Sequence, residues 1–205
     1  MYTRVKIGMT QSNLKIAITG GIGSGKSEVC SYIRRAGFPV FSCDEIYGEL
    51  LNKGIFDSDL KKCFGEQIFI DGKLNKKMLS GIVFENKEEL EKLNKLTHNK
   101  ILDCAFEKMK AYKLSFLEVP LLFENGFEEL FDGVIVVLRK IEDRIQSVVK
   151  RSSISTEEAI LRIKSQYNYD NYDFMKYYVI HNNSNFEHLS ECVNNVLKNI
   201  KEKLK

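Results

Sequence analysis

Residues 20–27 read GGIGSGKS and match the pattern G-x-x-x-x-G-K-[ST]. An apolar run at residues 14–19 precedes them, and a stretch with helical periodicity follows from about residue 26. Glycines let such a loop bend so that successive backbone N–H groups face a phosphate, and the helix N-terminus adds donors and a positive dipole end. A strand, a glycine-rich loop and a helix in this order predict an α/β fold that binds the phosphates of a nucleotide.

The residue types in the loop indicate separate roles in phosphate binding. Lys26 supplies a point charge for the β- and γ-phosphates, and the Ser27 hydroxyl is expected to ligate Mg²⁺ together with phosphates and water. The N–H of Glu28 is expected to reach the α-phosphate. The predicted nucleotide-binding residues are Gly20, Gly21, Ile22, Gly23, Ser24, Gly25, Lys26, Ser27 and Glu28.

Other short apolar runs alternate with helical patterns along the chain. The predicted strands are residues 14–19, 39–42, 114–119, 133–138 and 177–180. Helical patterns follow the loop, fill residues 55–112 apart from a turn at Asp71-Gly72, fill residues 141–169, and end the chain. Because most of the strand runs are apolar throughout, they indicate a parallel sheet covered on both faces, as in α/β proteins.

Two of the helical stretches are too long to be simple crossovers between strands. We expect residues 55–112 to form a helical insertion on the substrate side, and residues 141–169 to form a lid that excludes water. The remaining chain divides into an N-terminal extension, residues 1–13, and a nucleotide-binding core made of residues 14–54, 113–140 and 170–205.

The composition limits which kinds of binding partner and which cellular compartment we expect. The 31 Lys and Arg against 28 Asp and Glu give a net charge of only +3, which gives no reason to expect nucleic acid or membrane partners. The five cysteines show no C-x-x-C spacing and predict reduced, mostly buried thiols rather than a zinc site. No run approaches the roughly 18 apolar residues that a membrane span needs. We therefore expect a cytoplasmic protein.

A phosphate loop alone does not separate kinases from GTPases or ATPase modules. A GTPase would carry N-K-x-D after a strand, whereas the nearest run, residues 94–97, reads NKLT inside a helical pattern. The size of the chain and the long insertions favour a small-molecule kinase.

Three features in this order resemble the dephospho-CoA kinase family. They are TGGIGSGKS at residues 19–27, Asp44 after the second predicted strand, and VPLLFE at residues 119–124. The resemblance extends from about Leu14 to Asn183. It implies a P-loop kinase fold with a helical CoA-side domain and a lid. It also implies ATP and Mg²⁺ as cofactors, and transfer of the γ-phosphoryl group to the ribose 3′-hydroxyl of dephospho-CoA, the last step of CoA biosynthesis. We expect a monomer or a small homo-oligomer.

The chain departs from the family pattern at several positions. Ser42 replaces the first Asp of the family's Asp-Ala-Asp run. The family's H-P-x-I-R reads HNKIL at residues 98–102, so Asn99 and Leu102 replace the proline and the arginine. In the predicted lid the family's Q-x-x-R-L-x-x-R begins here with Arg144 and has Ser147 in place of the first arginine. Only the final arginine, Arg151, is kept.

The resemblance implies the catalytic residues Asp44, Lys26 and Arg151. Asp44 is expected to accept a hydrogen bond from the attacking hydroxyl, although an aspartate at this point can instead cap the following helix. Arg151 is expected to meet the charge on the transferred phosphoryl group, and Arg144 or Arg162 could serve instead.

Three further residues are candidates on the acceptor side. The resemblance implies substrate contacts for His98 and Glu124, in addition to Asp44. Glu118 and Glu124 are acidic groups near the end of the middle strand, and one of them could hold a Mg²⁺-bound water. A lone helix histidine such as His98 is more often a packed or solvated side chain.

The sequence leaves two alternative functions open. Another small-molecule P-loop kinase, acting on a nucleoside, nucleotide or sugar, would share the loop. A nucleotide-binding regulatory module would bind ATP without phosphoryl transfer.

Overall fold

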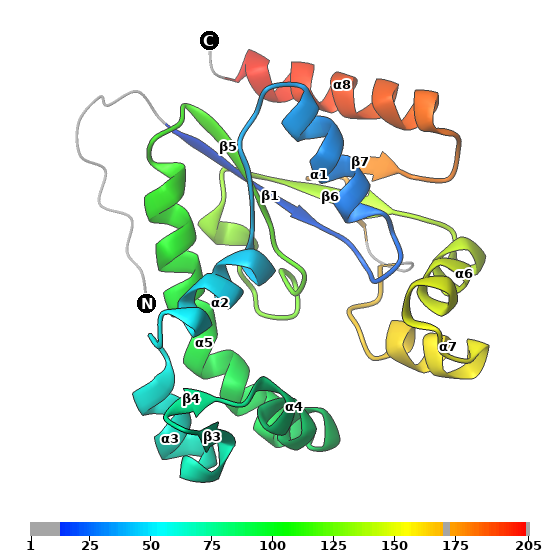
Figure 1. Ribbon diagram of the computed structural model, residues 1–205. Coiled ribbons are helices and arrows are strands. Elements are labelled where there is room, and N and C mark those ends of the chain that lie inside the picture. The colour runs from blue at the N-terminus through cyan, green and yellow to red at the C-terminus, as the bar shows by residue number, and fades with distance from the viewer. Residues whose placement is uncertain (1–12, 170–172, 204–205) are drawn as a thin grey trace. The chain divides into compact units, whose positions relative to one another are not determined.

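The computed structural model describes residues 13–169 and 173–203 (Figure 1). The predicted N-terminal extension, residues 1–13, therefore lies outside the described residues except for Asn13. The chain divides into two compact units. The first is Met1–Phe41 together with Met109–Lys205, and the second is Ser42–Lys108.

The first unit contains a five-stranded sheet with the order β2-β5-β1-β6-β7. The central strand β1 pairs in parallel with β5 and β6, and β6 pairs in parallel with β7. The strands are β1 (Leu14–Thr19), β2 (Val40–Ser42), β5 (Leu114–Glu118), β6 (Gly133–Leu138) and β7 (Tyr178–His181). The predicted α/β fold with a mainly parallel sheet is confirmed.

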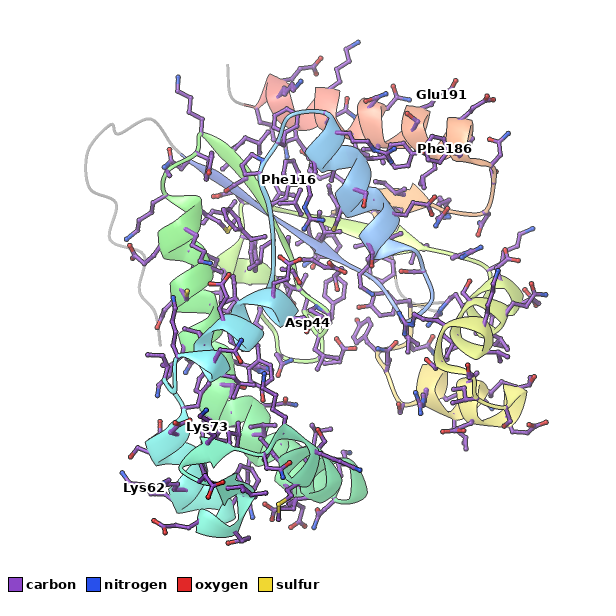
Figure 2. The ribbon with its side chains drawn as sticks, in the orientation of Figure 1. Asp44, Lys62, Lys73, Phe116, Phe186 and Glu191 are labelled. Carbon is purple, nitrogen blue, oxygen red and sulfur yellow. The ribbon has the colours of Figure 1, made fainter. Side chains whose placement is uncertain are left out.

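Two helices cover one face of this sheet. Helices α1 (Lys26–Arg35) and α8 (Phe186–Glu202) lie side by side in Figure 1 and pack against alternate strand residues in one apolar cluster. Phe116 of β5, labelled in Figure 2, belongs to this cluster and is fully buried. The intervening residues, such as Ala17 and Leu117, are buried as well, which explains why the strands read as continuous apolar runs.

The predicted lid contains α6 (Ile141–Ser152) and α7 (Thr156–Lys164). Helix α6 ends where Ser153 takes a left-handed conformation with φ 52°, and the Ser155 side chain caps α7 by accepting the N–H of Glu158. Residues 165–169 were predicted to be helical, but the helix stops before them. Their side chains and backbone bind other segments of the unit instead, as described below.

The second unit contains α2 (Cys43–Asn52), α3 (Asp57–Phe64), α4 (Lys76–Glu85) and α5 (Lys87–Met109), of which α5 runs one residue past it. A short 3₁₀ helix, η1 (Glu66–Ile68), leads into a hairpin of β3 (Phe69–Ile70) and β4 (Lys73–Leu74). Another 3₁₀ helix, η2 (Glu128–Leu130), lies in the first unit.

The turn predicted at Asp71-Gly72 is the two-residue loop of this hairpin. Both residues have positive φ, 50° and 76°, as a tight hairpin turn requires. The flanking strands have two residues each, too few to produce an alternating pattern in the sequence, so a purely helical stretch was the wrong expectation.

The second unit begins at Ser42, whereas the sequence predicts an insertion that begins at residue 55. The contacts of α2 explain the difference. The Tyr47 ring lies 5.9 Å from the ring of Phe56, and Glu49 Oε2 lies 2.6 Å from Lys108 Nζ. These contacts tie α2 to the helices that follow it.

All five cysteine thiols are free, but the expectation that they are mostly buried was wrong. Only Cys30 is buried, whereas Cys63 is exposed and the other three are partly exposed. Within the described residues, no helix combines the length and the apolar character that a membrane span requires.

Candidate phosphate-binding and phosphoryl-transfer site

The glycine-rich loop lies where the sequence predicts it, between β1 and α1. The N–H of Ser24 donates to the carbonyl of Gly21 at 3.1 Å, which closes a turn inside the loop. The N–H groups of Glu28 and Val29 donate to the carbonyl of Gly25 at 3.0 and 3.2 Å, so the helix begins directly after the loop. The loop therefore ends at a helix N-terminus, where unpaired N–H groups favour an anion.

Lys26 is folded back onto the loop. Its Nζ donates to the carbonyls of Gly20 and Gly21 at 2.6 and 3.2 Å. Burial lowers the pKa of Lys26, and the nearby charges of Arg144 and Arg151 lower it further, while Glu118 acts in the opposite direction. The ammonium group is thus held in place beside the loop by two backbone carbonyls.

Glu118, the last residue of β5, lies close enough to act on two groups of α1. It raises the pKa of Lys26 against the effect of burial. Burial, together with the charge of Glu118 and a hydrogen bond to it, raises the pKa of the Cys30 thiol to about 12. Cys30 is therefore a neutral, buried thiol, and Glu118 is the carboxylate that faces the lysine of the loop.

The three candidate arginines differ in what they contact. Arg144 is only 3% exposed, and its Nε donates to the carbonyl of Ile22 at 3.1 Å. Arg151 is exposed in the last turn of α6, but its charge acts on Lys26. Arg162 is paired with Glu158 of the same helix at 3.0 Å. Arg144 and Arg151 thus belong to the electrostatic surroundings of the loop.

Sequence reasoning missed three side chains that contact the loop or its neighbours. The buried amide of Asn182 donates to the carbonyl of Ser24 at 3.0 Å, and Gln166 Oε1 accepts the N–H of Ile22 at 2.6 Å. Arg139 donates to the carbonyl of Gly23 at 3.5 Å and to the hydroxyl of Ser147 at 3.0 Å. Asn182 directly follows β7, and this position at the carboxyl end of a parallel strand was a usable signal. Nothing in the local sequence indicates Gln166 or Arg139.

The VPLLFE run turns toward the segment after α7. The Phe123 ring lies among the rings of Tyr167, Tyr169, Phe174 and Tyr177, with centroid distances of 5.2 to 6.1 Å. Glu124 Oε1 accepts the N–H of Tyr167 at 3.0 Å. The motif therefore anchors this segment to the end of strand β5.

Tyr169 joins the same segment to the strand that precedes the loop. Its hydroxyl lies 3.3 Å from the Thr19 hydroxyl, and both side chains are buried. Burial raises the pKa of Tyr169, so the phenol is neutral at physiological pH. Together with Gln166 and Tyr167, this contact explains why residues 165–169 leave the helix.

Two of the predicted site residues, Asp44 and His98, belong to the second unit. Asp44 is exposed in the first turn of α2, two residues past the end of β2, and Figure 2 labels it there. Ser42, not Asp44, occupies the N-cap position of α2, so the helix-capping alternative for Asp44 is wrong. His98 is a half-buried residue of α5.

The residues present are compatible with Mg²⁺ bound mainly through phosphates and water. Ser27 is an exposed hydroxyl in the first turn of α1, and Glu118 supplies a carboxylate near Lys26. Magnesium in nucleotide sites commonly takes one or two protein oxygens and keeps several waters. Within residues 13–169 and 173–203, no group of three or more His, Cys, Asp or Glu side chains is arranged to hold a metal ion.

Comparisons with known proteins identify the family of the chain. The family model described as dephospho-CoA kinase matches residues 14–188. The dephospho-CoA kinase of Fusobacterium nucleatum is 38% identical over 181 residues, which cover 87% of this chain and 94% of that protein.

Solved structures extend the agreement to the fold. A crystal structure of a Thermus thermophilus protein has a TM-score of 0.77 and 32% identity, covering 92% of this chain and 98% of that one. The dephospho-CoA kinase of Campylobacter jejuni has a TM-score of 0.62 and 26% identity, with coverage of 93% and 98%. Because the family model matches residues 14–188 and a relative 38% identical to this chain is covered over 94% of its length, the chain belongs to the dephospho-CoA kinase family.

Proposed function

We propose that this chain transfers the γ-phosphoryl group of ATP to the ribose 3′-hydroxyl of dephospho-CoA, giving coenzyme A and ADP. The observation that carries the proposal is the phosphate loop with Lys26 folded beside it, in a chain that belongs to this family.

Lys26 is proposed to exchange its carbonyl partners for phosphate oxygens when ATP binds. Its bonds to Gly20 and Gly21 are bonds to neutral acceptors, and hydrogen bonds between charged groups are stronger. Negative phosphates also relieve the unfavourable burial of the ammonium group. The same charge then stabilises the transferring phosphoryl group, in which negative charge is spread over the equatorial oxygens.

Mg²⁺ is proposed to be held by the Ser27 hydroxyl, the phosphates and water, with Glu118 orienting one of the waters. When bound, the ion neutralises charge that develops between the β- and γ-phosphates. Ser27 lies in α1, which begins at the loop, and Glu118 ends β5, which pairs with β1, the strand that leads into the loop; this arrangement supports the proposal.

Asp44 is proposed to accept a hydrogen bond from the attacking 3′-hydroxyl and to aim its oxygen at the γ-phosphorus. An exposed carboxylate in a first helical turn is available for this contact. In a loose transition state its benefit comes mainly from positioning. His98 and Glu124 are proposed contacts to the acceptor. In the structure, the Glu124 carboxylate also accepts the N–H of Tyr167.

Arg151 is proposed to reach the transferred phosphoryl group from the end of α6. It is exposed, and it still lowers the pKa of Lys26, so its charge is felt at the loop. Arg144 is buried against Ile22 and is proposed below to act differently.

The proposed reaction is tested by ADP release in a coupled assay, with and without dephospho-CoA, followed by mass analysis of the product. The expected product is heavier than the acceptor by one phosphoryl group. A panel of nucleosides, nucleoside monophosphates and sugars serves as the alternative set of acceptors. A preference for any of these, or ATP binding without transfer to any acceptor, would reject the proposal.

The role of Asp44 is tested by Asp44→Asn, with Glu45→Gln as the matched control on the same exposed helical turn. The asparagine variant is expected to bind ADP normally and to lose most of its turnover, whereas the control keeps both. Normal turnover in Asp44→Asn would remove this residue from the mechanism.

We propose a cytoplasmic location for this activity. The five free thiols are typical of proteins in reducing compartments. Fractionation of cells that produce a tagged full-length chain tests the location.

A further inference from the structure

Both hydrogen-bonding groups of Ile22, in the middle of the phosphate loop, are held by side chains from distant parts of the sequence. Arg144 Nε donates to the Ile22 carbonyl at 3.1 Å, across 122 residues of sequence. Gln166 Oε1 accepts the Ile22 N–H at 2.6 Å, across 144 residues. Arg144 lies in α6 and Gln166 follows α7, so both partners of Ile22 come from the predicted lid.

Two glycines of the loop leave the space that Arg144 occupies beside it. A Cβ at Gly21 would collide with the guanidinium of Arg144, and a Cβ at Gly23 would lie 2.7 Å from the Arg144 carbonyl oxygen. Gly23 also has φ +78°, which side chains rarely adopt. Both glycines therefore allow α6 to approach the loop closely.

We propose that Arg144 and Gln166 are positioning residues of the nucleotide site, which hold Ile22 so that the loop keeps its phosphate-binding shape before the nucleotide arrives. The inference rests on the ATP use proposed above. A loop that is already ordered does not have to be ordered by its ligand, and this saves free energy on binding. Arg144 is only 3% exposed, so its hydrogen bond to the loop is shielded from competing water.

Arg144 also adds a positive charge that the family pattern lacks, because the family has glutamine at this position. Arg144→Gln therefore keeps a hydrogen-bond donor and removes the charge, whereas Arg144→Met removes both. Gln166→Met removes the acceptor for the Ile22 N–H at nearly unchanged side-chain length. The matched controls are Gln146→Leu and Lys150→Met, both exposed on α6.

The experiment measures the Kd for ADP by calorimetry, KM and kcat for ATP, and hydrogen exchange at the Ile22 amide by NMR. Losing one such hydrogen bond is expected to raise the Kd for ADP and the KM for ATP about tenfold, with kcat changed less than about threefold. The Ile22 amide is expected to lose protection in Gln166→Met. Arg144→Gln should lie between wild type and Arg144→Met, and both controls should bind ADP as wild type does.

Three outcomes overturn the inference. Unchanged nucleotide affinity in Arg144→Gln and Gln166→Met means that the loop holds its shape alone. Tighter ADP binding in Gln166→Met means that Gln166 competes with the nucleotide. A loss of kcat at unchanged Kd means that these residues act on the transferred group. If Arg144→Met does not fold, Gln166→Met decides, because its side chain is half-buried. ADP binding needs no acceptor, so failure of transfer to dephospho-CoA leaves this test unaffected.

Discussion

The two compact units use their polar side chains in different ways. In the first unit, Asn182, Gln166 and Arg144 each bind a backbone group of the phosphate loop. In the second unit, charged side chains mainly bind one another at the surface, as in the pairs Lys100–Asp59 and Lys108–Glu49. Buried bonds to backbone fix the shape of a loop, whereas exposed ion pairs contribute little to stability.

This difference would suit a nucleotide-binding role for the first unit and the acceptor-binding role proposed for the second. A phosphate loop works only if its N–H groups already point at one place, which requires partners that hold the backbone. The exposed charges of the second unit remain accessible to a ligand, as an acceptor-binding role would require. The five predictions below test this contrast.

The largest effect is expected for Lys26→Met. Removing the ammonium group should lower kcat/KM for ATP by about 10²- to 10³-fold, the usual loss when one preorganised charge is removed from a transferring group. The melting temperature should change little, because the unfavourable burial of the charge, shown by the lowered pKa of Lys26, offsets the loss of its bonds to Gly20 and Gly21. Steady-state kinetics measure kcat/KM, and scanning calorimetry measures the melting temperature. Lys100→Met in the second unit is the control, and an equal loss of activity there would break the contrast.

Asn182→Ala is expected to lower stability by about 1–3 kcal/mol, because the buried carbonyl of Ser24 loses its partner. The exposed Asn195→Ala on α8 should change stability little. Urea unfolding followed by circular dichroism compares the two variants. Equal stability of Asn182→Ala and wild type would show that the loop does not depend on this contact.

The lowered pKa of Lys26 predicts a shifted alkaline limit of ATP use. As pH rises through this lowered value, Lys26 loses its proton and its attraction for phosphates. The value of kcat/KM should therefore fall at a lower pH than it would with a lysine of ordinary pKa. The groups acting on it are Glu118, Cys30, Arg144 and Arg151. Arg144→Gln should move the limit to higher pH, because one repelling charge is gone. A profile that is identical in both proteins would contradict this.

The stability effect of Lys26 has the opposite trend with pH. The unfolded chain binds this proton more tightly than the folded chain, so this contribution makes the folded state more stable as pH rises between the lowered pKa and the ordinary value of 10.5. The same melting experiments, repeated across alkaline pH with Lys26→Met as reference, measure it.

The smallest effect is expected for the exposed pair Lys100–Asp59. Lys100 lowers the pKa of Asp59 through a hydrogen bond and its charge. The pair therefore stabilises the fold above the ordinary pKa of aspartate, and this contribution is lost as pH falls through the lowered value. At neutral pH, Lys100→Met should change the melting temperature by little more than the experimental error. At a pH below the lowered pKa of Asp59, it should not change the melting temperature. A large change would break the comparison between the units.

Much of the first unit could be predicted because its signals are local. The loop, the strand at Gly133–Leu138 and the terminal helix through Ile200 are each specified by a continuous run of residues. The short hairpin of the second unit was predicted only as a turn, because strands of two residues carry no periodicity.

The partners of the loop could not be predicted for a different reason. Gln166 and Arg144 reach Ile22 across more than a hundred residues, and this proximity exists only after the sheet brings β1 and β6 together. Arg144 was considered as one of three alternative lid arginines, and its burial separates it from Arg151 and Arg162. The choice between like residues on one helical segment depends on tertiary contacts.

The close approach of α6 to Gly21 has an evolutionary consequence. Because the Arg144 guanidinium fills the space where a side chain at position 21 would begin, we expect substitutions at the two positions to depend on each other. An alanine at position 21 therefore requires the Arg144 guanidinium to move or residue 144 to become smaller. Lineages of this family that keep a short residue at the α6 position are therefore expected to tolerate more variety in the second residue of the loop.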